Sequence, residues 1–308
     1  MSRWMPWSSK SVAGRAERAA VGSTPIHSRL YKVLVSKERN LHVSRKGVLS
    51  RSPFLAVLVA GLTLLAQQLP TYAQNLDNVV YLPMTAGPAA NCNIQGVSYG
   101  TLSPTVHTDR PAAEHGDLNL ALRGWSRTSA TLSLVSYGGD TDVQAPQIDA
   151  MFSPDRRPRF SSAHRVNHWH WGCNCRGGPS TDWDVTLLGM ATTPGEPLSI
   201  PDSGYHIGAG YEALVLYATE DRLTLKYSAE DNVVQGYTVH LENLCVDPDL
   251  LRLYRNLNAA GRRQLPALRE GQAFGRAGGS EILIAVRDNG TFLDPRSQKD
   301  WWKAYSVR

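Results

Sequence analysis

The sequence predicts a mainly β fold, an antiparallel β-sandwich with one inserted helix. Apolar and polar residues alternate in segments 222–227, 237–242 and 281–287. Because successive side chains of a strand point to opposite faces, this period of two is typical of half-buried antiparallel strands. Residues 211–218 are apolar almost throughout, which favours a central strand that is covered on both faces.

The helix is expected at about residues 247–261. Asp247 can cap its first turn, Pro248 suits the first helical position, and Gly261 can end it. Five apolar residues between these ends recur at helical spacing, so one face of the helix is expected to pack on the core. They are Leu250, Leu251, Leu253, Tyr254 and Leu257.

Two further segments carry weaker patterns. Leu118, Leu120 and Leu122 alternate with other residue types, so we expect another strand there. Residues 138–180 are rich in Pro, Gly and Arg and show few strand signals. Long loops are therefore expected in that region.

The first 73 residues predict an export signal. Residues 1–52 form a basic extension, and residues 53–66 are an apolar run that is too short to span a bilayer comfortably. Thr71-Tyr72-Ala73 then offers the small residues of a cleavage site, so we interpret residues 53–73 as a signal peptide. A secreted protein, extracellular or in the cell envelope, is expected.

Two alternatives stay open for this region. The apolar run could remain uncleaved as a membrane anchor, and the protein would then meet the membrane through that segment only. The basic stretch is longer than an export signal needs. Either the start codon is placed too early, with translation beginning near Val43 or Val48, or the chain has a genuine basic extension.

The positive charge of the chain lies in this N-terminal part. The whole chain has a net charge of +5 and residues 1–52 carry +9, which leaves −4 for the remainder. Nucleic-acid binding is therefore not indicated, since it relies on clustered positive charge in the folded part. With residues 74–90 as a short linker, the β-rich domain is expected over residues 91–303.

Four cysteines lie in the expected mature chain: Cys92, Cys173, Cys175 and Cys245. An even number in an exported protein favours disulfides. Because a Cys-x-Cys pair would close a strained ring, we expect Cys173 and Cys175 to pair separately with Cys92 and Cys245. The sequence leaves the order of partners open.

The region 222–300 contains a distinctive order of turns and strands. A Gly-Gln-x-apolar-Gly turn at 271–275 precedes a strand that ends in Val286-Arg287, and an Asn-Gly turn and an Asp-Pro pair follow. This order resembles the end of the M23 (lysostaphin-type, duplicated hybrid motif) peptidoglycan endopeptidases. The chain also resembles a group of exported bacterial proteins whose domain ends in Asp-Trp-Trp. The resemblance implies a β-rich scaffold and a cell-envelope setting.

The M23 resemblance also implies where a zinc site would lie. The family binds zinc through a His-x-x-x-Asp motif and one His of a His-x-His pair, and two further histidines act in catalysis. At these places this chain has His115 with Asn119, and Glu281 with Leu283. Asn is a weak zinc ligand and Leu is none, so the resemblance implies a degenerate site without metal or catalytic residues.

Polar residues near these positions are the expected lining of a vestigial binding groove. Asp117 would share a face with Asn119, and His240 and Glu242 lie at or near the place of a catalytic histidine of the family. The expected lining consists of His115, Asp117, Asn119, His240, Glu242 and Glu281.

A second cluster lies at residues 164–175. His164, His168 and His170 precede the Cys-x-Cys pair and could bind zinc or copper. Disulfides compete for the thiols in an oxidising compartment, so the other interpretation is a disulfide-tethered loop with surface histidines.

The tryptophans suggest glycan binding, because exposed indoles stack on the faces of sugars. Trp169, Trp171 and Trp183 could bind glycan in this way, and so could Trp301-Trp302 near the C-terminus. Core packing is the commoner fate of tryptophan.

We therefore expect a secreted, non-catalytic binding or scaffold module for peptidoglycan or another envelope glycan, without a cofactor. One alternative is a metal-dependent hydrolase with a rearranged zinc site, built from His115 and Asp117 or from the cluster at 164–175. Another is a purely structural extracellular domain. Metal content, the number of free thiols and retention on insoluble peptidoglycan would separate these alternatives.

Overall fold

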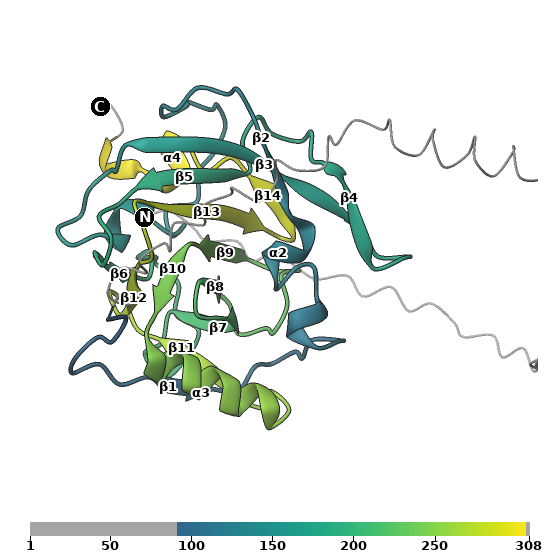
Figure 1. Cartoon of the computed structure of the whole chain (residues 1–308), viewed down its shortest axis with the longest axis vertical. Helices are drawn as coiled ribbons and strands as arrows, with labels where there is room; N and C mark the ends of the chain where they lie inside the picture. The colour runs from purple at the N-terminus through teal and green to yellow at the C-terminus, as the bar shows by residue number, and fades with distance from the viewer. Residues whose placement is uncertain (1–90, 306–308) are drawn as a thin grey trace, which may run out of the picture. The chain divides into compact units, whose positions relative to one another are not determined.

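The structure, a computed structural model, describes residues 91–305, which contain two antiparallel β-sheets and one twelve-residue helix (Figure 1). This confirms the predicted mainly β fold, a sandwich with one inserted helix. The basic extension, the signal peptide and the linker predicted for residues 1–90 lie outside the described residues.

The larger sheet crosses the whole domain, and every pairing between its strands is antiparallel. Its order is β1 (Gly100–Leu102), β11 (Leu265–Leu268), β7 (Ala213–Ala218), β8 (Arg222–Lys226), β9 (Tyr237–Glu242), β13 (Glu281–Asp288), β5 (Leu187–Ala191), β3 (Phe160–His170) and β2 (Trp125–Arg127). In addition, β14 (Thr291–Leu293) pairs with β13, and β4 (Cys175–Pro179) pairs with β3. The smaller sheet contains β10 (Leu244–Val246), β12 (Ala273–Ala277) and β6 (Pro197–Ser199).

Helices are few and mostly short in the described chain. They are α2 (Leu120–Arg123), α3 (Pro248–Ala259) and α4 (Gln298–Trp301), with 3-10 turns η1 (Ala112–Glu114), η2 (Ile148–Met151) and η3 (Lys303–Tyr305). The predicted cap of α3 is confirmed, because the carboxylate of Asp247 accepts hydrogen bonds from the N–H groups of Asp249 and Leu250. Across the described residues, no helix has the length and apolar character that crossing a membrane requires.

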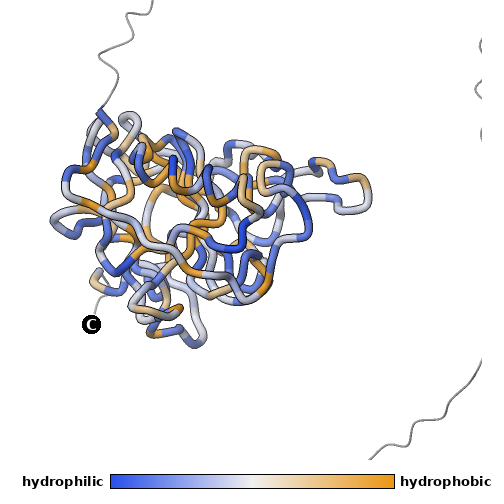
Figure 2. The backbone as a smooth tube through the Cα atoms, turned by 90° about the horizontal axis from the view of Figure 1, so that it is seen from below, coloured by the Kyte–Doolittle hydropathy of each residue, from blue (hydrophilic) through white to orange (hydrophobic). Residues whose placement is uncertain are grey.

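The main hydrophobic core lies on one face of the larger sheet. Leu225, Val239 and Val286 point to that side together, because facing residues of antiparallel strands share a face. Leu250 and Tyr254 of α3 add to the same core. In Figure 2 the chain through the middle of the domain is largely hydrophobic. Burial of each such leucine or valine stabilises the fold by about 1.5–3 kcal/mol.

One prediction about secondary structure is wrong, and another is right for only part of its range. The expected strand at Leu118, Leu120 and Leu122 is a turn followed by α2. Leu118 and Leu120 pack into two different hydrophobic clusters, which residues on one face of one strand would not do. The long loops expected at 138–180 are confirmed for residues 138–159, which contain no strand, but the remainder includes β3 and β4. The outer half of β3 lies away from the core, so no apolar alternation marks it.

The disulfide pairing also differs from the prediction. Cys173 bonds Cys175, and Cys92 bonds Cys245. A Cys-x-Cys ring is possible here because the two cysteines flank Asn174 at the tip of the β3–β4 hairpin, where Asn174 adopts a positive φ of 48°. Asn tolerates that left-handed conformation better than most residues, and the chain can turn tightly there.

Candidate functional site

A row of polar side chains occupies the face of the larger sheet opposite the main core. On β8 and β9, the positions that alternate with core residues carry charged, imidazole and hydroxyl groups, and on β13 Arg287 shares this face with the apolar Leu283 and Ala285. The ladder places these groups side by side, since partners on neighbouring antiparallel strands share a face. The row consists of Arg222, Thr224, Lys226, Thr238, His240, Glu242 and Arg287.

Asp117 covers one end of this row and holds two arginines. Its carboxylate accepts a hydrogen bond from Arg287 at 2.8 Å and another from Arg123 of α2. Both guanidinium groups also lie over the ring of Phe292, at 4.5 Å for Arg287 and 5.4 Å for Arg123. The ion pairs join the segment that precedes α2 to β13.

Burial and ion pairing shift the pKa values of this cluster in opposite directions. Burial alone would raise the pKa of Asp117, but Arg287 and Arg123 outweigh it and hold that pKa below its usual value. Burial lowers the pKa of Arg287 to about 10, against the opposing effect of Asp117. At neutral pH the cluster therefore contains one carboxylate and two guanidinium cations.

His240 lies beneath this cluster and is 0% exposed. Its Nδ1 is 3.1 Å from the hydroxyl of Thr224, which itself donates to the carbonyl of Leu118 at 2.7 Å. Because the hydroxyl has one proton, Nδ1–H must be the donor to Thr224, which leaves a lone pair on Nε2. That nitrogen has no hydrogen-bond partner among the described residues. Burial, reinforced by Arg287, lowers the pKa of His240, so its ring is neutral.

An open hollow of about 450 Å³ lies outside Asp117. Its walls come from three places in the sequence: the segment before α2, the tip of the β3–β4 hairpin, and the loop between β8 and β9. This volume is within the range of small-molecule sites. The lining residues are His107, Thr108, Asp109, Arg110, His115, Asp117, Trp171, Asn232, Val233 and Val234.

His115 is held in a fixed orientation in this hollow. Its Nδ1 accepts a hydrogen bond from the N–H of Asp117 at 3.1 Å, so the proton of the neutral ring is on Nε2. Nε2 points to Asp109, with 3.4 Å between Nε2 and Oδ1. Burial lowers the pKa of His115, which keeps the ring neutral near pH 7. The ring also meets Trp171 edge-on, with 5.1 Å between centroids.

Trp171 gives the hollow an aromatic wall, and its residue is 44% exposed. Arg110 lies over the indole at 4.8 Å and binds Asp109 through two hydrogen bonds. The Arg110 side chain holds the pKa of Asp109 below its usual value. The hollow therefore combines one half-exposed apolar ring with ionised groups of both signs.

The β3–β4 hairpin reaches the segment before α2 through a close contact. A Cβ atom added to Gly116 would lie 2.6 Å from the Trp169 ring, so only glycine fits there. The indole N–H of Trp169 donates to Asn174 at 3.3 Å, and Arg110 donates to the same side-chain oxygen at 2.8 Å. Both packing and hydrogen bonds therefore hold the hairpin tip against the segment before α2.

The six residues predicted to line a groove fall into separate sets. His115 and Asp117 line the hollow, while His240 lies covered beneath Asp117, Arg123 and Arg287. Asn119 precedes α2 as its N-cap residue, with its amide donating to the carbonyl of Ala113 at 2.9 Å. The remaining two, Glu242 and Glu281, have other partners: Glu242 lies 3.2 Å from Arg222, and Glu281 accepts from Ser161 and Ser162.

The second predicted cluster is also divided. His164 is half-buried in the middle of β3, whereas His168 and His170 are exposed beyond it. Four residues of strand span about 13 Å, so His164 and His168 cannot share one metal ion with ligand distances near 2 Å. Within residues 91–305 no group of three or more His, Cys, Asp or Glu side chains is arranged to hold a metal ion.

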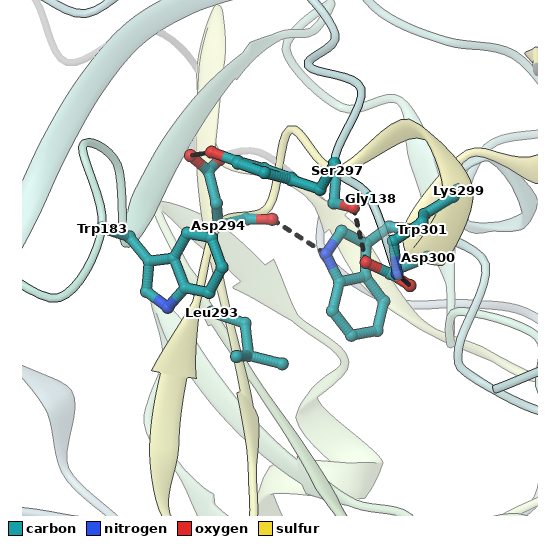
Figure 3. Close-up of a pocket in the computed structure, with 9 residues that line it drawn as sticks. Gly138, Trp183, Leu293, Asp294, Ser297, Lys299, Asp300 and Trp301 are labelled. Carbon is teal, nitrogen blue, oxygen red and sulfur yellow. Dashed lines mark hydrogen bonds and ion pairs between the residues drawn. The ribbon is translucent and has the colours of Figure 1, made fainter. Parts of the chain in front are cut away.

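The tryptophans near the C-terminus do not offer a sugar-binding surface, which corrects that suggestion. Trp301 and Trp302 are buried, and their indole N–H groups donate to the carbonyls of Asp294 and Pro295. Trp183 lies at a second hollow of only about 100 Å³ (Figure 3). Several polar groups there, such as Asp294 with Tyr137, already bind each other, so the hollow has little to offer a ligand.

Several residues of the site were not candidates from the sequence. Arg123 and Arg287 neutralise Asp117, and Asp109 and Arg110 form the outer wall of the hollow. Arg287 could have been recognised from the sequence, because it is a charged residue in a mostly apolar strand and lies on the same face as Leu283. The other three come together only through the fold.

Comparison with protein-family models, with curated proteins and with solved structures finds no match for this chain. The resemblance to M23 peptidases therefore remains a prediction from the motifs of residues 222–300.

Proposed function

We propose that this domain is a non-catalytic carbohydrate-binding module, and that the hollow beside His115 and Trp171 binds a glycan of the cell envelope, with peptidoglycan as the first ligand to test. A half-exposed indole beside a network of ionised groups carries this proposal. Sugars present an apolar face of C–H groups and a rim of hydroxyls. Trp171 suits the first, and Asp109 and Arg110 suit the second.

The secretion signal expected at residues 53–73 supports an envelope or extracellular setting for this module. The four described cysteines are all in disulfides, which suits an oxidising compartment. A glycan ligand would then be present where the protein is present.

A hydrolase with a rearranged zinc site is less well supported by these residues. Arg123 and Arg287 both bind Oδ1 of Asp117 and neutralise the negative charge that would attract a metal ion. Leu283 of β13 lies opposite Glu242 of β9, and the M23 resemblance implies a histidine at the position of Leu283. The two cysteines of the cluster at 164–175 bond each other, which removes their thiolates as ligands.

Co-sedimentation of the purified protein with insoluble peptidoglycan tests the proposal. We expect saturable retention of the wild type and about ten-fold weaker retention of Trp171→Ala, because a lost aromatic contact costs about 1.5 kcal/mol. Trp183→Ala removes an indole from the smaller hollow and serves as the matched control with unchanged retention. If the wild type is not retained on peptidoglycan or on other envelope polysaccharides, the proposal is wrong.

A further inference from the structure

The Cys173–Cys175 disulfide occupies an unusual place in the molecule. Both cysteines are exposed at the tip of the β3–β4 hairpin, and one residue separates them in sequence. The other disulfide differs in both respects, because Cys245 is buried and lies 153 positions from Cys92. An exposed disulfide is open to attack by a thiolate, whereas a buried one is shielded.

The residue inside this small ring is a structural connector. Asn174 adopts a positive φ and accepts hydrogen bonds from Arg110 and from Trp169. Arg110 in turn lies over Trp171 and binds Asp109. The disulfide therefore holds the backbone conformation that presents Asn174 to the wall of the hollow.

Two arginines neighbour the disulfide, one in sequence and one through its contact with Asn174. Arg176 follows Cys175 directly, and Arg110 reaches the loop between the two cysteines. Arg110 is paired with Asp109 and Arg176 donates to carbonyls of α2, so it is the exposure of the two cysteines that makes exchange possible.

From these contacts we propose that Cys173–Cys175 is an exchangeable disulfide that reacts with small dithiols while the domain stays folded, and that its opening loosens the wall formed by Arg110, Trp169 and Trp171. The proposal does not depend on the glycan ligand. It assigns thiol–disulfide exchange to the hairpin tip.

The exchange proceeds in two steps that balance. A thiolate of the dithiol attacks the sulfur of one cysteine, the bond between Cys173 and Cys175 breaks, and its electron pair leaves on the other cysteine, which takes a proton from water. The second thiol of the reagent then attacks the mixed disulfide and releases the first cysteine. The protein disulfide gains two electrons, and the dithiol is oxidised to its own cyclic disulfide.

Titration of the purified full chain with dithiothreitol tests the exchange. Free thiols are trapped by alkylation and assigned by peptide mass spectrometry, and circular dichroism follows the fold. We expect Cys173 and Cys175 to become alkylated at a dithiothreitol concentration at least ten-fold lower than Cys92 and Cys245, with the β signal unchanged. The inference is overturned if all four cysteines react together, or if Cys173 and Cys175 react only when the β signal is lost.

Tryptophan fluorescence tests the link to the hollow. Reduction of the wild type is expected to shift the emission toward longer wavelength, and the oxidised variant Asn174→Ala should show the same shift without any reductant. The double variant Cys173→Ser/Cys175→Ser should respond no further to dithiothreitol in the low range. A wild type whose emission is unchanged after selective reduction would refute the structural link.

Discussion

At the scale of single residues, the site depends on one carboxylate that neutralises two arginines. Asp117 binds Arg123 and Arg287 in a buried setting, where an unpaired charge is costly. Asp117 was a predicted lining residue of the groove because it would share a face with Asn119. Its partners could not be predicted, because they come from α2 and from β13, far along the chain.

Replacement of Asp117 by alanine would leave two like charges facing each other below the surface. We expect the free energy of unfolding to fall by about 3–5 kcal/mol, the range for removal of one partner of a buried ion pair. Denaturant unfolding measures this change. Asp109→Ala is the control, because the side chain of Asp109 is 66% exposed and should cost less than about 1 kcal/mol. Equal losses of unfolding free energy in the two variants would contradict a stabilising role for the buried ion pairs of Asp117.

Glu242 gives the fold a pH dependence with a defined sign. Burial raises its pKa to about 7, although Arg222 opposes the shift. The folded protein therefore binds more protons than the unfolded chain, so stability is highest below about pH 4.5 for this group and falls as the pH rises to 7. Glu242→Gln should reduce the loss of melting temperature between pH 5 and pH 8.

Glu212 provides an independent test of the same effect, since burial also raises its pKa to about 7. Glu212→Gln should reduce the same loss independently, and the double variant should show the flattest profile. A wild-type melting temperature that rises from pH 5 to pH 8 while Glu242→Gln behaves identically would contradict the assignment.

At the scale of elements, the β3–β4 hairpin positions the hollow. It belongs to the region 138–180, where loops were expected, because its outer half carries histidines and tryptophans away from the core. The central strands and α3 followed their hydrophobic periods and were predicted correctly. The central strands and the helix were therefore visible in the sequence, whereas the buried strands β5 and β11 and the hairpin that forms the site were not.

The hairpin depends on the absence of a side chain at Gly116. Gly116→Ala would place a methyl group 2.6 Å from the Trp169 ring, so the hairpin tip must move. We expect a loss of about 1–3 kcal/mol in unfolding free energy, typical of overpacking, and a change in tryptophan emission. Gly178→Ala on β4 is the control, since a methyl group there meets no described atom within 4 Å. Unchanged stability and emission in Gly116→Ala would contradict this packing.

At the scale of the whole molecule, the two disulfides close loops of very different length. Cys92–Cys245 ties the first described residues to β10 across 153 positions, whereas Cys173–Cys175 closes only a local ring. The sequence predicted four bonded cysteines but the wrong partners, because the pairing depends on a hairpin that the sequence pattern did not reveal.

Because a long closed loop restricts the unfolded chain more than a short one, the two disulfides should differ in their effect on stability. We expect Cys92→Ser/Cys245→Ser to lower the unfolding free energy by about 2–5 kcal/mol. Cys173→Ser/Cys175→Ser should have a clearly smaller effect in the same denaturant titration. The reverse order would show that Cys173–Cys175, and not Cys92–Cys245, is the disulfide that stabilises the domain.

The most direct measurement of the central claim locates the ligand on the protein. Soluble fragments of envelope glycan are titrated into the labelled protein, and the side-chain resonances of the tryptophans and histidines are followed by NMR. We expect saturable shifts of Trp171 and His115, with Trp183 unchanged. Saturable shifts confined to other parts of the domain, or no shifts with any envelope glycan, would contradict the central claim.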